Sequence, residues 1–204
     1  MQEQEKQTAK GRDLYEWVQS LVGSVLVVVA IFTFVIRMMG VDGHSMLNTL
    51  QHGDRLLVVN SMLYHDYQYG DIVILRKNGV FDDDPIVKRV IAVEGQTVDI
   101  DFAEGIVYVD GAALDEDYVN EPTYKSYLEY GMGLDYPVEV PEGSVFVMGD
   151  NRNESADSRF APVGCVPESQ ISGRVLLIVV PGSQTDKQGN ITGGRVWRRI
   201  GAVA

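Results

Sequence analysis

A serine and a lysine stand in this chain where they could act as a nucleophile and its base. Ser45 lies in the stretch GHSMLNTL, and Lys88 lies inside the apolar run PIVKRVIAV. A serine hydroxyl is a weak nucleophile until a neighbouring group accepts its proton. The two residues therefore suggest nucleophilic catalysis in which Ser45 attacks and a second residue serves as the base.

Lys88 is the favoured candidate for that base. Side chains alternate along a strand, so Lys88 and Arg89 face opposite sides, and one of them points toward the less polar side. A free lysine has a pKa of about 10.4, and burial can lower it by up to roughly 3–5 units. Arginine does not give up its proton. The competing interpretation is that Lys88 lies on an edge strand and points to water.

The histidines offer an alternative base, in a Ser–His–Asp arrangement. His44, His52 and His65 match no familiar metal-ligand pattern. His44 adjoins Ser45, so the two side chains would point to opposite sides of an extended segment. The single cysteine, Cys165, excludes an internal disulfide and a cysteine-based zinc cluster. We therefore expect neither a metal nor a cofactor.

A polar loop, GDNRNESADSR, directly follows the apolar stretch SVFVM. Asp157 and Arg159 are two residues apart and could brace this loop as an ion pair. Ser155 could exchange a hydrogen bond with a lysine amine. A polar loop without further evidence is usually only a connection between strands.

The bulk composition limits the function classes. The chain has 204 residues and a formal net charge of −12 at pH 7. Its length suits one globular domain with small additions. The acidic charge excludes nonspecific nucleic-acid binding, which requires a basic surface.

Residues 17–36, WVQSLVGSVLVVVAIFTFVI, contain no charged side chain. Twenty helical residues extend about 30 Å, which is the thickness of the hydrocarbon core of a bilayer. A core helix would show a polar stripe, and the apolar region of a signal peptide is shorter. We predict a polar tail over 1–16, a single transmembrane anchor over 17–36 and a globular domain over 37–204.

The charges that flank this segment favour one orientation only slightly. Lys6, Lys10 and Arg12 precede the segment, whereas Arg37 and Arg55 follow it. Positive charge tends to stay in the cytoplasm. The N-terminus is therefore expected to be cytoplasmic and the domain extracytoplasmic.

The remainder of the chain has the pattern of a mainly β protein. Short runs rich in Val and Ile alternate with Gly, Pro, Asn and Asp, which is typical of strands and turns. A short helix is considered only at residues 167–172, and the tail after Pro181 is expected to be solvated. Strands are predicted at residues 56–60, 71–76, 86–93, 106–111, 144–150 and 173–180.

Together these stretches resemble the bacterial type I signal peptidases, which are membrane-anchored Ser–Lys proteases that remove secretory signal peptides. The likeness covers nearly the whole chain in order: the anchor, GHSMLNTL, GDIVIL, VKRVIAVEGQ and GDNRNESADSR. It implies a compact, β-barrel-like catalytic domain of antiparallel strands. Asn48 stands where the family has proline, and Ala92, Glu94 and Gln96 depart from its lysine box; these positions are interpreted as structural.

The resemblance also implies roles for particular residues. Ser45 would be the nucleophile, Lys88 the general base, and Ser155 the residue that orients the lysine. Asp157 and Arg159 would form a supporting salt bridge. The loop beside the dyad would be held by Gly149, Asp150 and Asn151. The backbone N–H of Ser45 would stabilise the oxyanion, and Gly43 leaves the second donor unassigned.

The implied activity is cleavage of signal peptides from secreted preproteins at the outer face of the cytoplasmic membrane, through an acyl-enzyme. An extended substrate would add to a strand edge, with small residues at the first and third positions before the cut. The segment 112–141 is interpreted as a contributor to selectivity. The expected wall residues of the substrate site are Val41, Met46, Leu50, Ile86 and Val87.

Two other classes of protein fit the sequence less well. An anchored peptide-binding relative that acts in surface-fibre assembly would be expected to lack Ser45 or Lys88, and both are present. A self-cleaving repressor would carry a DNA-binding helical domain, whereas this chain is acidic and has an apolar span.

Overall fold

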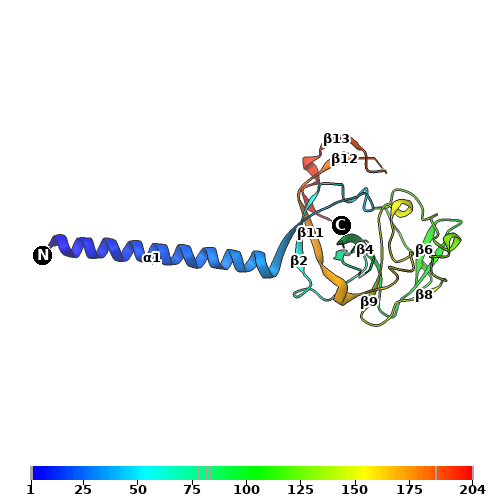
Figure 1. Cartoon of the computed structure of the whole chain (residues 1–204), viewed down its shortest axis with the longest axis horizontal. Helices are drawn as coiled ribbons and strands as arrows, with labels where there is room; N and C mark the ends of the chain where they lie inside the picture. The colour runs from blue at the N-terminus through cyan, green and yellow to red at the C-terminus, as the bar shows by residue number, and fades with distance from the viewer. Residues whose placement is uncertain (1, 78, 81, 83, 187, 204) are drawn as a thin grey trace. The chain divides into compact units, whose positions relative to one another are not determined.

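The computed structural model describes residues 2–77, 79–80, 82, 84–186 and 188–203, with side chains from residue 15 onward. The chain divides into two compact units, one up to Arg37 and one from Met38 onward. The expectation of a mainly β protein with one N-terminal apolar helix is confirmed (Figure 1).

The first unit is a single long helix. Helix α1 spans Gln2–Ala30 and continues as a π-helical segment over Ile31–Val35. Within it, Tyr15–Val35 is long and apolar enough to cross a membrane, and none of its most apolar stretch is buried. A core helix is mostly buried, so the exposure of this stretch favours a membrane span over that alternative. The predicted span ended at Ile36, which instead begins strand β1.

The second unit is built on an eight-stranded sheet. Its order is β1-β2-β11-β3-β4-β9-β10, and β14 also pairs with β11. The pairings of β11 with β2 and β3, of β3 with β4, and of β4 with β9 are antiparallel. The strands are β1 (Ile36–Gly40), β2 (Arg55–Asn60), β3 (Ile72–Leu75), β4 (Ile86–Val93), β9 (Ser144–Met148), β10 (Val166–Pro167), β11 (Ile171–Val180) and β14 (Gly201–Ala202).

Two smaller antiparallel sheets complete the described strands. In Figure 1 the four-stranded sheet lies on the side of the domain away from β2 and β11, where β6 and β8 are labelled. Short 3-10 turns cover Leu128–Tyr130, Arg152–Glu154, Glu168–Gln170 and Trp197–Arg199. The four-stranded sheet has the order β7 (Ala112–Ala113), β6 (Ile106–Val109), β5 (Thr97–Asp101), β8 (Val138–Glu139), and the hairpin pairs β12 (Ser183–Thr185) with β13 (Ile191–Arg195).

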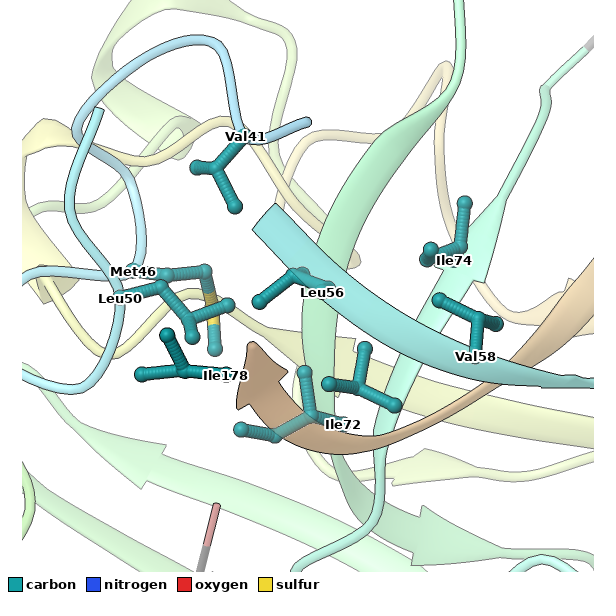
Figure 2. Packing of buried hydrophobic residues seen from close by; sticks show 9 residues of the cluster. Val41, Met46, Leu50, Leu56, Val58, Ile72, Ile74 and Ile178 are labelled. Carbon is teal, nitrogen blue, oxygen red and sulfur yellow. The ribbon is translucent and has the colours of Figure 1, made fainter. Parts of the chain in front are cut away.

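Val- and Ile-rich strands bury both faces of the large sheet. One cluster of apolar side chains lies between β2, β3, β11 and the segment 41–50 (Figure 2). A second cluster joins β3, β4 and β9 to β10 and β11, and a third joins β4 and β9 to the four-stranded sheet. The members of the first cluster are Val41, Met46, Leu50, Leu56, Val58, Ile72, Ile74, Val175 and Ile178.

All six strands that were expected are present, but two expectations about the C-terminal third need correction. Residues 167–172 contain only one 3-10 turn before β11 begins. The tail after Pro181 is not simply solvated, because it forms the hairpin and then returns to β11 as β14. Arg199 anchors it by donating to the buried Asp54 carboxylate at 2.7 and 2.9 Å. This long-range ion pair leaves no local pattern in the sequence.

Candidate active site

Ser45 lies in a tight turn that two hydrogen bonds from Asn151 attach to the loop after β9. Gly43, two residues earlier, has φ of +112°, a conformation that glycine adopts without strain. Asn151 donates its backbone N–H to the Ser45 carbonyl at 3.0 Å and its side-chain amide to the His44 carbonyl at 3.0 Å. The serine is thereby held against the loop that was predicted to support it.

Lys88 lies on β4, which is paired on both sides, with β3 and with β9. Only 3% of its surface is exposed. The interpretation of an edge-strand lysine pointing to water is therefore excluded. Its Nζ lies 2.7 Å from Ser45 Oγ and donates to the Val87 carbonyl at 3.0 Å. The structure thus brings the predicted nucleophile and base into hydrogen-bond contact.

Burial changes the protonation of this amine. It lowers the pKa of Lys88 to about 8, because the charged form loses its hydration. The charges of Asp157 and Asp150 oppose this shift, and that of Arg159 assists it. About one tenth of the amine is therefore neutral at pH 7 and about half at pH 8, and the neutral form is the one that a general base requires.

His52 and His65 contact other groups, and no histidine side chain bonds Ser45 in the described part of the chain. His52 Nδ1 lies 3.2 Å from Asp42 and 3.3 Å from the Gly43 nitrogen. His65 Nε2 contacts the Met62 carbonyl at 3.3 Å. The alternative Ser–His–Asp arrangement finds no geometric support.

The predicted ion pair between Asp157 and Arg159 is present and fully buried. Arg159 donates from Nε and Nη2 to the two carboxylate oxygens at 2.8 and 2.9 Å. Burial alone would raise the pKa of Asp157, but the Arg159 charge and three hydrogen bonds lower it overall. The carboxylate therefore stays ionised, and it also accepts the Gly149 N–H at 2.9 Å.

The expected hydrogen bond between Ser155 and Lys88 is not found among the described residues. The Ser155 hydroxyl instead donates to Asp157 at 2.8 Å. Its neighbour across the loop is Gly149, where a side chain would meet Ser155 Oγ at 2.3 Å and the Ser45 carbonyl at 2.5 Å. Only glycine lets these segments approach so closely.

Sequence reasoning missed a layer of arginines beside the dyad. Arg89 is 2% exposed and donates to both oxygens of Asp150, at 2.9 and 2.8 Å. Thr49 donates to the same carboxylate at 2.5 Å. Arg152 donates to Glu116 and, at 3.1 Å, to the Gly149 carbonyl. The available signal was the KR pair at 88–89, since two basic residues inside an apolar run both require buried partners.

The five expected wall residues divide into two groups. Ile86 and Val87 line a cavity of about 330 Å³, together with Met39, Gly40, Asp42, Ile74, Asp84 and Pro85. In contrast, Val41, Met46 and Leu50 belong to the buried cluster of Figure 2, and Leu50 has no exposed surface. The structure therefore separates residues that line the cavity from residues that pack beneath it.

The backbone N–H of Ser45 is a candidate donor for an oxyanion. The Gly43 N–H points to His52, whereas the Ser45 N–H makes no hydrogen bond to the described residues. No group of three or more potential metal ligands occurs in the described ranges either. Taken together, the site contains a hydroxyl, a buried amine and a backbone donor.

Known proteins similar to this chain are signal peptidases. Residues 14–180 match the family model described as signal peptidase, peptidase S26. A probable signal peptidase I-1 of Synechocystis sp. is 40% identical over 74% of this chain and 75% of its own length. The signal peptidase I of Bacillus licheniformis is 35% identical over 90% of this chain and 98% of its own.

A solved signal peptidase I from Enterococcus faecalis is also similar, with 28% identity, a TM-score of 0.41, and coverage of 53% of this chain and 96% of that one. The sequence matches support signal peptidase I function and, with it, a serine endopeptidase. Because the family model covers most of the chain and relatives reach 40% identity, this protein belongs to the signal peptidase family, peptidase S26.

Proposed function

We propose that this protein cleaves N-terminal signal peptides from secreted preproteins with Ser45 as nucleophile and Lys88 as general base. The observation that carries the proposal is the 2.7 Å contact between Lys88 Nζ and Ser45 Oγ at a buried amine. An exposed amine would be protonated and could not accept the serine proton. Here burial favours the neutral form.

The reaction is acyl transfer in two stages. Neutral Lys88 accepts the hydroxyl proton while Ser45 Oγ bonds to the carbonyl carbon of the scissile peptide. The Ser45 N–H stabilises the oxygen that becomes negative. The tetrahedral intermediate collapses as Lys88 gives its proton to the leaving amine. Water, deprotonated by Lys88, then hydrolyses the ester and regenerates the hydroxyl.

The cavity lined by Ile86 and Val87, the residues just before Lys88, suits an extended peptide. It is lined by Met39 and Gly40 of β1, which stands at one end of the sheet order, and by Ile86 and Val87 at the start of β4. An end strand has unpaired backbone groups to which a peptide can add. The cavity is small and its apolar wall suits short side chains such as alanine at the positions before the cut.

The remaining proposals concern the membrane. Residues 1–16 form a cytoplasmic tail, 17–36 the anchor, and 37–204 the extracytoplasmic domain. The apolar helix supports the anchor, and the flanking charges favour this orientation. Ser45 follows the span by about ten residues, and an extended chain reaches only about 3.3–3.6 Å per residue. The nucleophile would then act close to the outer membrane surface.

The test is cleavage of a preprotein with alanine at the first and third positions before the cut. Purified full-length protein in detergent should release the signal peptide. Ser45→Ala and Lys88→Ala should each abolish cleavage while thermal unfolding stays cooperative. Ser169→Ala is the matched control, since Ser169 is exposed. Retention of most activity in the Lys88→Ala variant would assign the base to another residue.

A further inference from the structure

One segment of the chain touches all three parts of the proposed site. Residues 115–123, DEDYVNEPT, belong to the connection between β7 and β8 of the four-stranded sheet and are called the strap below. The three parts are the turn that carries Ser45, the strand β4 that carries Lys88, and the loop 149–159. They are distant in sequence, so a segment that contacts each of them can fix their relative positions.

The contact of the strap with the serine turn is a single amide hydrogen bond. Asn120 donates its side-chain N–H to the carbonyl of Leu47 at 3.0 Å. Leu47 is two residues beyond Ser45, and its backbone N–H bonds the His44 carbonyl at 3.2 Å. Asn120 therefore supports the turn on the side that follows the nucleophile.

The contact with the lysine strand is made by an aromatic ring. The Arg89 guanidinium lies over the ring of Tyr118, with Cζ 3.9 Å from the ring centroid. The same guanidinium holds Asp150 in a two-bond ion pair. A cation over an aromatic face is stabilised by the negative face of the ring. Tyr118 thus covers the charge that fixes both β4 and the residue after Gly149.

The contact with the loop passes through Arg152. This arginine donates to Glu116 and, at 3.0 Å, to the Thr123 hydroxyl, and its Nε donates to the Gly149 carbonyl. Tyr118 also contacts this group of residues. Its hydroxyl donates to Glu116 at 2.8 Å, and the centroid of its ring lies 5.9 Å from Cζ of Arg152. The two ends of the strap therefore hold the loop from one side.

We propose that the strap is a positioning device for the Ser45–Lys88 pair, and that Tyr118 is its central residue, acting through Arg89. This inference rests on the proposed function but assigns residues outside the reacting groups. A loosened Arg89 leaves Asp150 less neutralised, and Asp150 raises the pKa of Lys88. Loss of the ring should therefore make the amine harder to deprotonate as well as displace it.

Three variants of the full-length protein in detergent separate the ring from its hydroxyl. Tyr118→Leu fills the space without an aromatic face, and Tyr118→Phe keeps the face and removes the hydroxyl. Tyr124→Leu is the control, because Tyr124 is 53% exposed and, among the described residues, donates only its backbone N–H, to Pro122 and Asn153. Each is assayed for kcat and KM on the preprotein from pH 6 to 10, and its rate is corrected for the folded fraction.

We expect Tyr118→Leu to lower kcat roughly tenfold, because small misplacements of reacting groups are costly, and to change KM less than about twofold. The pH at which its rate is half-maximal should rise. Tyr118→Phe and Tyr124→Leu should stay within about threefold of the parent. Unchanged kcat and pH midpoint in Tyr118→Leu, or equal losses in Leu and Phe variants, would overturn the role of the ring.

A second readout separates this inference from the proposed function. Titration of the Lys88 amine by nitrogen NMR, in protein labelled at lysine, requires no substrate. Tyr118→Leu should titrate at higher pH than the parent and than Tyr124→Leu. If the parent cleaves no preprotein, the proposed function fails, while the titration still decides whether Tyr118 governs the amine. An unshifted titration contradicts the inference even when cleavage is normal.

Discussion

Lys88 and Arg89 are neighbours on β4 and are almost equally buried, with 3% and 2% of their surfaces exposed. The amine of Lys88 contacts a hydroxyl and a carbonyl oxygen. The guanidinium of Arg89 contacts a carboxylate with two hydrogen bonds. Lys88 is therefore hydrogen-bonded to uncharged groups, whereas Arg89 is hydrogen-bonded to a carboxylate.

The difference explains how one site can contain a base beside permanent charges. Burial without a directly bonded carboxylate lowers the pKa of Lys88. Burial also opposes the charge of Arg89, but its bonds to Asp150 outweigh that effect and raise its pKa. Arg152 and Arg159 are paired with carboxylates in the same way. The arginine layer gives the site rigidity, and the dyad beside it gives the neutral amine.

The largest expected effect comes from replacing Lys88 with arginine, the residue type of its neighbour. Lys88→Arg keeps a positive charge but cannot become neutral. Cleavage should fall by at least about 10³-fold, which is within the range for loss of a general base. The measurement is kcat on a preprotein at pH 8, with circular dichroism as the check on folding. A variant with a tenth of the parental rate would show that the amine is not the base.

The second largest effect is a loss of stability when Arg89 is replaced. Arg89→Met leaves Asp150 buried without its cation, so the free energy of unfolding should fall by about 3–5 kcal/mol. Urea denaturation of the full-length protein in detergent measures this loss. Little change would mean that the arginine layer contributes less to the fold than its buried ion pairs indicate.

Replacement of Lys88, unlike that of Arg89, is expected to stabilise the folded protein. Lys88→Met should abolish activity yet raise the free energy of unfolding at pH 7 by about 1–3 kcal/mol. At this pH the amine is mostly charged in both states, and the substitution removes the cost of burying that charge in the folded protein. Between pH 8 and about 10.4 the unfolded state binds more protons, so parental stability should rise with pH. The variant should lose that slope. Destabilisation by Lys88→Met would contradict the comparison.

The smallest effect is the pH dependence of the parent enzyme. With the pKa of Lys88 at about 8, the active neutral form increases as pH rises through that value. The rate at pH 7 should be roughly one tenth of the rate at pH 9, with a limiting slope of one on the acidic side. A half-maximal rate near pH 10 would indicate an ordinary exposed lysine.

Much of the molecule could be predicted from local pattern alone. The uncharged run at 17–36 and the six Val- and Ile-rich runs correspond to the apolar helix and to β2, β3, β4, β6, β9 and β11. β5 was missed because its sequence, TVDID, places acidic residues on the exposed face and lacks a long apolar run. The hairpin of β12 and β13 was missed because its residues are mostly polar or glycine.

The sequence by itself determined which residues could react: a hydroxyl in a glycine-containing turn and one amine inside an apolar run. It did not determine which face of β4 meets Ser45, because alternation separates Lys88 from Arg89 without saying what covers either side. Only the tertiary structure brought together residues 43 positions apart and supplied Asp150 for Arg89. Local periodicity arises from backbone geometry, whereas the partners of a buried charge come from distant segments.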